Sequence, residues 1–156
     1  MDFTLNESQI GIQKLAREFA ENELAKEILV RDETRVFPLD LYGKMAELGL
    51  MGLPYSTEYG GQGADYLSYI LALEEISKVD ASMGIAYSVC TSLYCASFDN
   101  ADAPDEMKKK YLTPVASGKA LGSFALTEPT AGSDASGCRT VAVKDGDSYV
   151  INGSKC

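Results

Sequence analysis

Apolar side chains recur at helical spacing through most of this chain. In the first such segment charged residues separate them, and the apolar positions are Ile12, Leu15, Phe19 and Ile28. This pattern predicts a long amphipathic helix that ends near Asp32. Thr4 and Glu7 have the spacing of a capping box, with Thr4 at the N-cap and the Glu7 carboxylate reaching back to the Thr4 amide.

A second helix is predicted to begin at Pro38 and to end before Gly49. Proline suits the first turn, because the N–H that it lacks has no helical partner there. Leu41, Met45 and Leu48 form the inward stripe of this helix. Gly49 suits the left-handed position that closes a helix at its carboxyl end.

The helical periodicity stops between Leu50 and Asp65. Pro54 and the glycines of the segment 60–63 require a looped backbone there. A glycine-rich loop can bind phosphate, but this one follows no predicted strand and lacks a Lys-Ser/Thr pair. We therefore interpret it as a structural connection.

Two further helices are predicted after this loop. The first extends from Tyr66 to Lys78, and the second is capped by Asp80 or Ser82 and runs to about Phe98. The second is apolar nearly all round, which is typical of a helix buried on several sides.

Glu74 and Glu75 are adjacent carboxylates on the first of these two helices. A carboxylate pair suggests acid–base chemistry, but adjacent side chains on a helix diverge by about 100° and do not face each other. We expect such a carboxylate to be solvated, or paired across helices, and not to be catalytic.

The pattern becomes strand-like after one more short helix at 105–112. Pro114 and Gly118 are expected to end the helical region. An apolar run from Ala120 to Leu126 predicts a buried strand, and a second strand is expected from Arg139 to Lys144.

The fold class follows from this order of elements. Asp145-Gly146-Asp147 separates two apolar runs and predicts a β-hairpin. The chain is therefore expected to be mainly α, with a helical bundle domain at 1–118 and the first strands of a β domain at 119–156.

Composition narrows the function. A net charge of −9 and a pI near 4.5 argue against a nucleic-acid partner. The four scattered cysteines, without any histidine, give no zinc pattern, and Cys90 and Cys95 are expected to be buried free thiols. The N-terminal residues lack a basic leader and no apolar run could span a bilayer, so we expect a cytoplasmic protein without a membrane span.

The stretch from Leu126 to Ala135 is dense in small and turn-forming residues. Successive amides in such a turn can form an anion-binding concavity, to which the Thr127 and Ser133 hydroxyls would add donors. Composition alone favours an ordinary loop between strands.

The string LTEPTAGSDASG at 126–137 resembles the flavin-binding signature of the acyl-CoA dehydrogenases, most of all the short-chain, butyryl-CoA type. The resemblance extends along the chain, in the same order, at 59–63 (YGGQG), 73–76 (LEEI) with 80–82 (DAS), 109–112 (KKYL) and 150–155 (VINGSK). It implies an N-terminal helical bundle domain followed by an incomplete β domain.

The resemblance implies α,β-dehydrogenation of an acyl-CoA, with hydride transfer to FAD, in fatty acid metabolism. Residues that it assigns to cofactor binding are Phe124, Ala125, Leu126, Thr127, Gly132 and Ser133. Backbone and hydroxyl groups of Leu126 and Thr127 would contact the flavin's pyrimidine edge. Gly132 and Ser133 would approach the pyrophosphate, and Ser133 would also touch the substrate.

It also implies that the catalytic glutamate and the tetramer interface lie on polypeptide outside this chain. No catalytic residue is therefore assigned in this chain, and Glu128 is not expected to be the catalytic base. We expect this N-terminal portion alone to be inactive and to bind FAD weakly or not at all. Electron-transferring flavoprotein and a homotetrameric assembly are expected for the full-length enzyme.

Two other interpretations stay open. One is related chemistry on the same scaffold, as in an enoyl-CoA reductase or an acyl-CoA oxidase. The other is a stand-alone helical interaction module without catalysis, which would bind a protein partner but neither FAD nor acyl-CoA.

Overall fold

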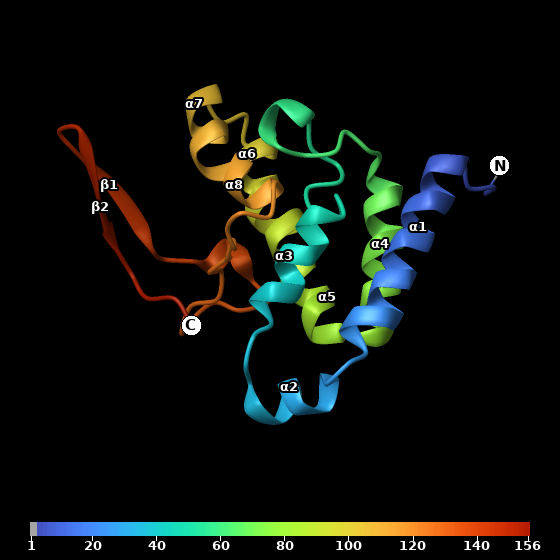
Figure 1. Ribbon diagram of the computed structural model, residues 1–156. Coiled ribbons are helices and arrows are strands. Elements are labelled where there is room, and N and C mark those ends of the chain that lie inside the picture. The colour runs from blue at the N-terminus through green and yellow to red at the C-terminus, as the bar shows by residue number, and fades with distance from the viewer. Residues whose placement is uncertain (1–2) are drawn as a thin grey trace. The chain divides into compact units, whose positions relative to one another are not determined.

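The computed structural model describes residues 3–156, and most of them are helical (Figure 1). The chain divides into two compact units, one ending at Ser123 and the other spanning Phe124–Cys156. The predicted fold class, mainly α with a small sheet, is confirmed. The domain boundary after residue 118 stays a prediction.

The helical unit contains eight α-helices in its described part, several of them joined by π-helical turns. Their bounds are α1 Glu7–Phe19, α2 Ile28–Thr34, α3 Leu39–Glu47, α4 Tyr66–Val79, α5 Ala81–Ser88, α6 Ala96–Asn100, α7 Asp105–Met107 and α8 Thr113–Ala116. The π-helical turns span Ala20–Leu24, Val89–Cys95 and Lys108–Leu112. α1 and α4 run side by side (Figure 1).

The N-cap of the first helix lies two residues later than predicted. Asn6 is the N-cap, and its side chain accepts a 2.9 Å hydrogen bond from the Gln9 amide. The Gln9 side chain accepts in turn from the Asn6 amide at 3.0 Å. The predicted box of Thr4 and Glu7 is therefore wrong. Asparagine caps at least as well as threonine, and glutamine serves as well as glutamate at the third position.

The single long helix to Asp32 is also wrong. The chain turns at Glu27, which takes a left-handed φ of 57° between the first π-helical turn and α2. The Arg31 guanidinium donates to the backbone oxygens of Leu24 and Lys26, and pairs with Asp80 at 3.0 Å. These contacts, two of them to nearby backbone oxygens and one to a residue distant in the sequence, outweigh the helical pattern.

The central helices are confirmed, except that Leu48, expected on the inward stripe of the second helix, is exposed. Pro38 immediately precedes α3, and Gly49 follows it in the left-handed region with φ 72°. α4 ends one residue beyond its predicted end. Asp80, and not Ser82, caps α5 by accepting from the Met83 amide at 2.9 Å. The helical run that starts there continues as far as α6.

The last helix extends further than expected. Pro114 does not end the helical region, because it lies in the first turn of α8, where its missing N–H is tolerated. Burial along the run from α5 to α6 is also uneven: Cys90 and Cys95 are buried free thiols as predicted, whereas Ile85 and Leu93 are exposed.

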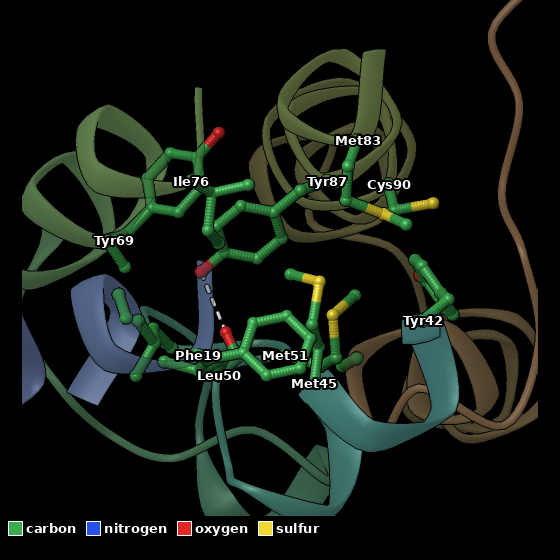
Figure 2. Close-up of a cluster of buried hydrophobic side chains, with 14 of the residues drawn as sticks. Phe19, Tyr42, Met45, Leu50, Met51, Tyr69, Ile76, Met83, Tyr87 and Cys90 are labelled. Carbon is green, nitrogen blue, oxygen red and sulfur yellow. Dashed lines mark hydrogen bonds between the residues drawn. The ribbon is translucent and has the colours of Figure 1, made fainter. Parts of the chain in front are cut away.

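Two hydrogen-bonded tyrosines lie in the core of the helical unit. Figure 2 shows Tyr87 donating to the backbone oxygen of Leu50, at 2.7 Å, among buried side chains from α1, α3, α4 and α5. Tyr69 packs edge-on against Tyr87, with ring centroids 5.3 Å apart. Tyr55 similarly donates to the backbone oxygen of Thr91, so the loop before α4 is tied to the core by tyrosine hydroxyls.

The predicted strand at 120–126 is not formed among the described residues. Extended backbone needs a neighbouring strand to hold its N–H and C=O groups, and within residues 3–156 the strands that pair are β1 (Val141–Asp145) and β2 (Ser148–Asn152). Leu121, Phe124 and Leu126 of this segment are exposed.

The predicted hairpin is confirmed. β1 and β2 are antiparallel with Asp145 opposite Ser148, and Gly146 takes a φ of 59° in the turn. β1 starts two residues later than predicted, because the amides of Arg139 and Thr140 donate to the Glu128 carboxylate and not to a strand.

Glu75 ties α4 to α1, which confirms pairing across helices for this carboxylate. Its side chain is only 4% exposed and accepts from the Arg17 guanidinium at 2.9 and 3.0 Å, from Gln13 at 3.1 Å and from Lys78 at 3.1 Å. The Arg17 hydrogen bonds, more than any other contact, lower the pKa of Glu75 to about 2. Neighbouring Glu74 is exposed, and its carboxylate pairs with Lys78 at 3.1 Å.

We predict that Glu75→Gln lowers the free energy of unfolding by about 1–3 kcal/mol at pH 7, because a buried, charge-assisted network is broken. Glu74→Gln is the matched control, with an expected change within about 0.5 kcal/mol. A carboxyl group whose pKa is lowered in the fold stabilises it above the unfolded pKa of 4.5 and ceases to do so as the pH falls toward 2.

Urea unfolding at several pH values tests this prediction. The difference between wild type and Glu75→Gln should narrow progressively below pH 4.5. A constant difference down to pH 2.5 would contradict the assignment.

Candidate functional site

The predicted cofactor segment forms a tight turn in the second unit. The Glu128 amide donates to the Ala131 oxygen at 2.9 Å, and the Ala131 amide donates back to the Glu128 oxygen at 3.1 Å. Pro129 and Thr130 lie at the exposed tip between them. The turn therefore holds its own ends together and presents the following residues, Gly132 and Ser133, to solvent.

The buried carboxylate of Glu128 anchors this turn to the base of the hairpin. It accepts from the Arg139 amide at 2.7 Å, the Thr140 amide at 3.0 Å and the Lys155 ammonium at 2.9 Å. The Arg139 amide, followed by Thr140 and Lys155, holds the pKa of Glu128 well below its usual range. Glu128 is consequently an ionised anchor whose acceptor oxygens are occupied, and it is not available as a base.

Lys155 joins three parts of the unit. Besides Glu128, its ammonium donates to the backbone oxygen of Leu126 at 2.9 Å and lies 3.7 Å from the Cys138 sulfur. The next residue, Cys156, donates its amide to the Thr127 oxygen at 2.8 Å. The carbonyl groups of Leu126 and Thr127 are thus both engaged from the same short segment.

The amide groups of the predicted site remain available. Within residues 3–156, the N–H groups of Leu126, Thr127, Gly132 and Ser133 donate to no protein acceptor. All four residues are exposed. A methyl group built on Gly132 meets no atom within 4 Å, so the packing of this chain does not explain why this position has no side chain.

The six predicted cofactor residues fall into two groups. The first group is Phe124, Ala125, Leu126 and Thr127, which precede the turn and are all exposed. Gly132 and Ser133 follow the turn. The assignment of these six residues to FAD, and of Ser133 to the substrate, stays a prediction.

Sequence reasoning missed the roles of Lys155 and Cys138. The predicted hairpin could have shown that these two residues lie close together, because extending the register of β1 and β2 outward sets position 138 opposite 155. The engagement of the Glu128 carboxylate by amides eleven and twelve residues later had no sequence signal.

A separate cavity of about 580 Å³ lies in the helical unit between α2 and the start of α5. It is lined by apolar side chains, among them Leu29, Phe37 and Met83, and by the Arg31–Asp80 ion pair. None of the predicted site residues lines it.

The described residues also bear on metal and membrane binding. No group of three or more Cys, Asp or Glu side chains at positions 3–156 is arranged to hold a metal ion. Among the helices in that range, none is both long and apolar enough to cross a membrane.

Comparison with known proteins decides the family. The sequence model described as "Acyl-CoA dehydrogenase, N-terminal domain" matches residues 6–119. The chain belongs to the acyl-CoA dehydrogenase family. This confirms the family predicted from the motifs.

Curated relatives extend the similarity across the whole chain. A short-chain specific acyl-CoA dehydrogenase from Clostridium acetobutylicum is 50% identical over 155 residues, which are 99% of this chain and 41% of that protein. The caffeyl-CoA reductase–Etf complex subunit CarC from Acetobacterium woodii is 42% identical, over 92% of this chain and 38% of that protein. The chain thus spans about 40% of the length of the relatives that it matches.

Solved structures share the same fold. Butyryl-CoA dehydrogenase from Megasphaera elsdenii superimposes with a TM-score of 0.91 at 41% identity, covering 99% of this chain and 41% of that one. A glutaryl-CoA dehydrogenase from Mycobacterium smegmatis in complex with FADH2 gives 0.89 at 32% identity, covering 97% and 39%.

We predict that Glu128→Gln releases the base of the hairpin. The uncharged amide cannot accept from both backbone amides and the ammonium, so hydrogen exchange at Arg139 and Thr140 should accelerate several-fold at neutral pH. Asp147→Asn in the exposed turn is the control and should leave both amides unchanged. Equal exchange in the two variants would show that the carboxylate does not hold this turn.

Proposed function

We propose that the protein carrying this chain is an FAD-dependent acyl-CoA dehydrogenase that acts on short-chain acyl-CoA thioesters. The observation that carries the proposal is the set of unpaired, exposed amides at Leu126, Thr127, Gly132 and Ser133, on a turn whose carbonyl side is already engaged. The similarity to a short-chain dehydrogenase and to a structure with FADH2 supports the choice of substrate and cofactor.

The chain's own residues would bind and orient the cofactor. FAD, when bound, supplies the hydride acceptor for the α,β-dehydrogenation. The Thr127 amide and hydroxyl, with the Leu126 amide, would donate to the flavin's pyrimidine edge, where such donors stabilise negative charge. Phe124 and Ala125 would lie along the same edge.

The two residues after the turn would meet the phosphate groups. Gly132 leaves open space for close backbone approach, and its amide and that of Ser133 form adjacent donors for a pyrophosphate. The Ser133 hydroxyl would in addition contact the acyl-CoA substrate. The donors before the turn would thus contact the flavin ring, and the donors after it would contact the phosphates and the substrate.

The proposal assigns the catalytic base to polypeptide outside these 156 residues. Glu128 is the one buried carboxylate in the described part of the second unit, and its oxygens are occupied by the Arg139 and Thr140 amides and by Lys155. This chain alone is therefore expected to be inactive, and to hold FAD weakly or not at all.

We extend the proposal to partners and setting. Electron-transferring flavoprotein would reoxidise the flavin, the full-length enzyme would be a homotetramer, and it would act in cytoplasmic fatty acid metabolism. The relative named as part of a caffeyl-CoA reductase–Etf complex favours one second candidate, an enoyl-CoA reductase on the same scaffold. The preferred direction of the reaction with butyryl-CoA and crotonyl-CoA distinguishes the two, because both candidates would use an electron-transferring flavoprotein.

Flavin content provides the first test. We predict stoichiometric flavin absorbance, near 450 nm, for the full-length protein, and little or none for residues 1–156 alone. A flavin-free full-length protein that binds a protein partner would favour the non-catalytic interaction module. Stoichiometric flavin in the isolated chain would contradict the expected weak binding.

The open space at Gly132 provides a second test. Gly132→Ala should leave the fold of the flavin-free protein unchanged, because the added methyl meets no protein atom within 4 Å. It should weaken FAD binding roughly tenfold, since the methyl blocks close approach of the phosphates. Gly11→Ala on α1 has equally open surroundings and is the matched control. Equal FAD affinity in the two variants would contradict the assignment of Gly132 to the FAD site.

A further inference from the structure

We propose that Lys155 is a positioning residue that aims the Thr127 amide at the flavin. The inference rests on the proposed function and adds to it a residue that lies outside the predicted cofactor segment. Its basis is the hydrogen bond from the Lys155 ammonium to the Leu126 oxygen, at 2.9 Å.

Peptide geometry connects the two groups. The Leu126 carbonyl and the Thr127 N–H belong to one peptide unit, and every described peptide bond is trans. In a trans unit the C=O and N–H bonds point in opposite directions. A donor that holds the Leu126 oxygen therefore directs the Thr127 N–H away from Lys155.

The neighbouring peptide unit is fixed differently. The Thr127 oxygen accepts from the Cys156 amide at 2.8 Å, while the Glu128 N–H at the other end donates to Ala131 at 2.9 Å. That unit is held at both ends and has no donor left for a ligand. The Leu126–Thr127 unit is held only at its oxygen, so its N–H is the oriented and unpaired one.

Glu128 keeps the ammonium in place. Lys155 lies between the Glu128 carboxylate and the Leu126 oxygen, with its side chain 29% exposed. The Cys138 thiol adds a second, weaker donor to the same oxygen at 3.6 Å. An ammonium on the carbonyl end of a peptide unit also polarises it, which strengthens its N–H as a donor.

The consequence for the cofactor is electrostatic as well as geometric. A preoriented donor at the pyrimidine edge stabilises the reduced, more negative flavin more than the oxidised one. Lys155 would thus raise the flavin midpoint potential without touching the flavin.

The test compares Lys155→Met with Lys144→Met in the full-length protein. Methionine keeps an unbranched stem and removes the ammonium, and Lys144 is an exposed β1 residue whose side chain makes no hydrogen bond or ion pair in the described part of the chain. Lys155→Met should weaken FAD binding roughly tenfold, as expected for losing one charge-assisted hydrogen bond. It should also shift the flavin midpoint potential to a more negative value, and Lys155→Arg should restore part of both changes.

Crystal structures of the flavin-free variants provide a readout that needs no cofactor. In Lys155→Met the Leu126–Thr127 peptide unit should be rotated or occupy two orientations, whereas Lys144→Met should keep the wild-type one. FAD affinity and potential equal to those of Lys144→Met, with that unit unmoved, would overturn the inference and leave the proposed function standing. A full-length wild-type protein that binds no FAD would instead overturn the proposed function, and the peptide orientation would still test the role of Lys155.

Discussion

The second unit depends on one buried ionic contact, that between the Glu128 carboxylate and its three donors. Two of these donors are backbone amides at the base of the hairpin, and the third is the Lys155 ammonium. Three structural features of the unit are linked to this contact. It sets where β1 begins, joins the turn to the base of the hairpin, and positions the lysine that engages the Leu126 oxygen.

A carboxylate in a cofactor loop could transfer protons or could anchor the backbone, and this contact indicates which of the two Glu128 does. An acid with free oxygens and a raised pKa would suit proton transfer. Glu128 has the opposite character, because its donors lower its pKa and fill its acceptor sites. The same ionised state that excludes it as a base makes it a stable anchor across the physiological pH range.

The helical unit could be predicted largely from sequence, because its helices follow the apolar period and their caps follow standard residue preferences. The failures there come from side-chain hydrogen bonds that the apolar period does not describe. Arg31 reaches carbonyl oxygens around a left-handed Glu27 and breaks what the pattern describes as one helix. Asn6 competes successfully with Thr4 for the first cap.

In the second unit the turn residues and the hairpin could be predicted, whereas the strand at 120–126 could not. An apolar run indicates a buried strand but does not supply the neighbouring strand that a ladder requires. The candidate site shows the same limit. The motif indicated a set of candidate binding amides, but only the structure shows that Lys155 and Cys156 hold the carbonyls of Leu126 and Thr127.

The most direct measurement is a crystal structure of the full-length protein with FAD bound. We expect the Thr127 nitrogen at hydrogen-bond distance, about 2.8–3.2 Å, from an acceptor on the flavin's pyrimidine edge, with the Lys155 ammonium still bound to the Leu126 oxygen. It also predicts that the Gly132 and Ser133 amides face the pyrophosphate. A flavin bound elsewhere, with these amides facing solvent or protein, would contradict it.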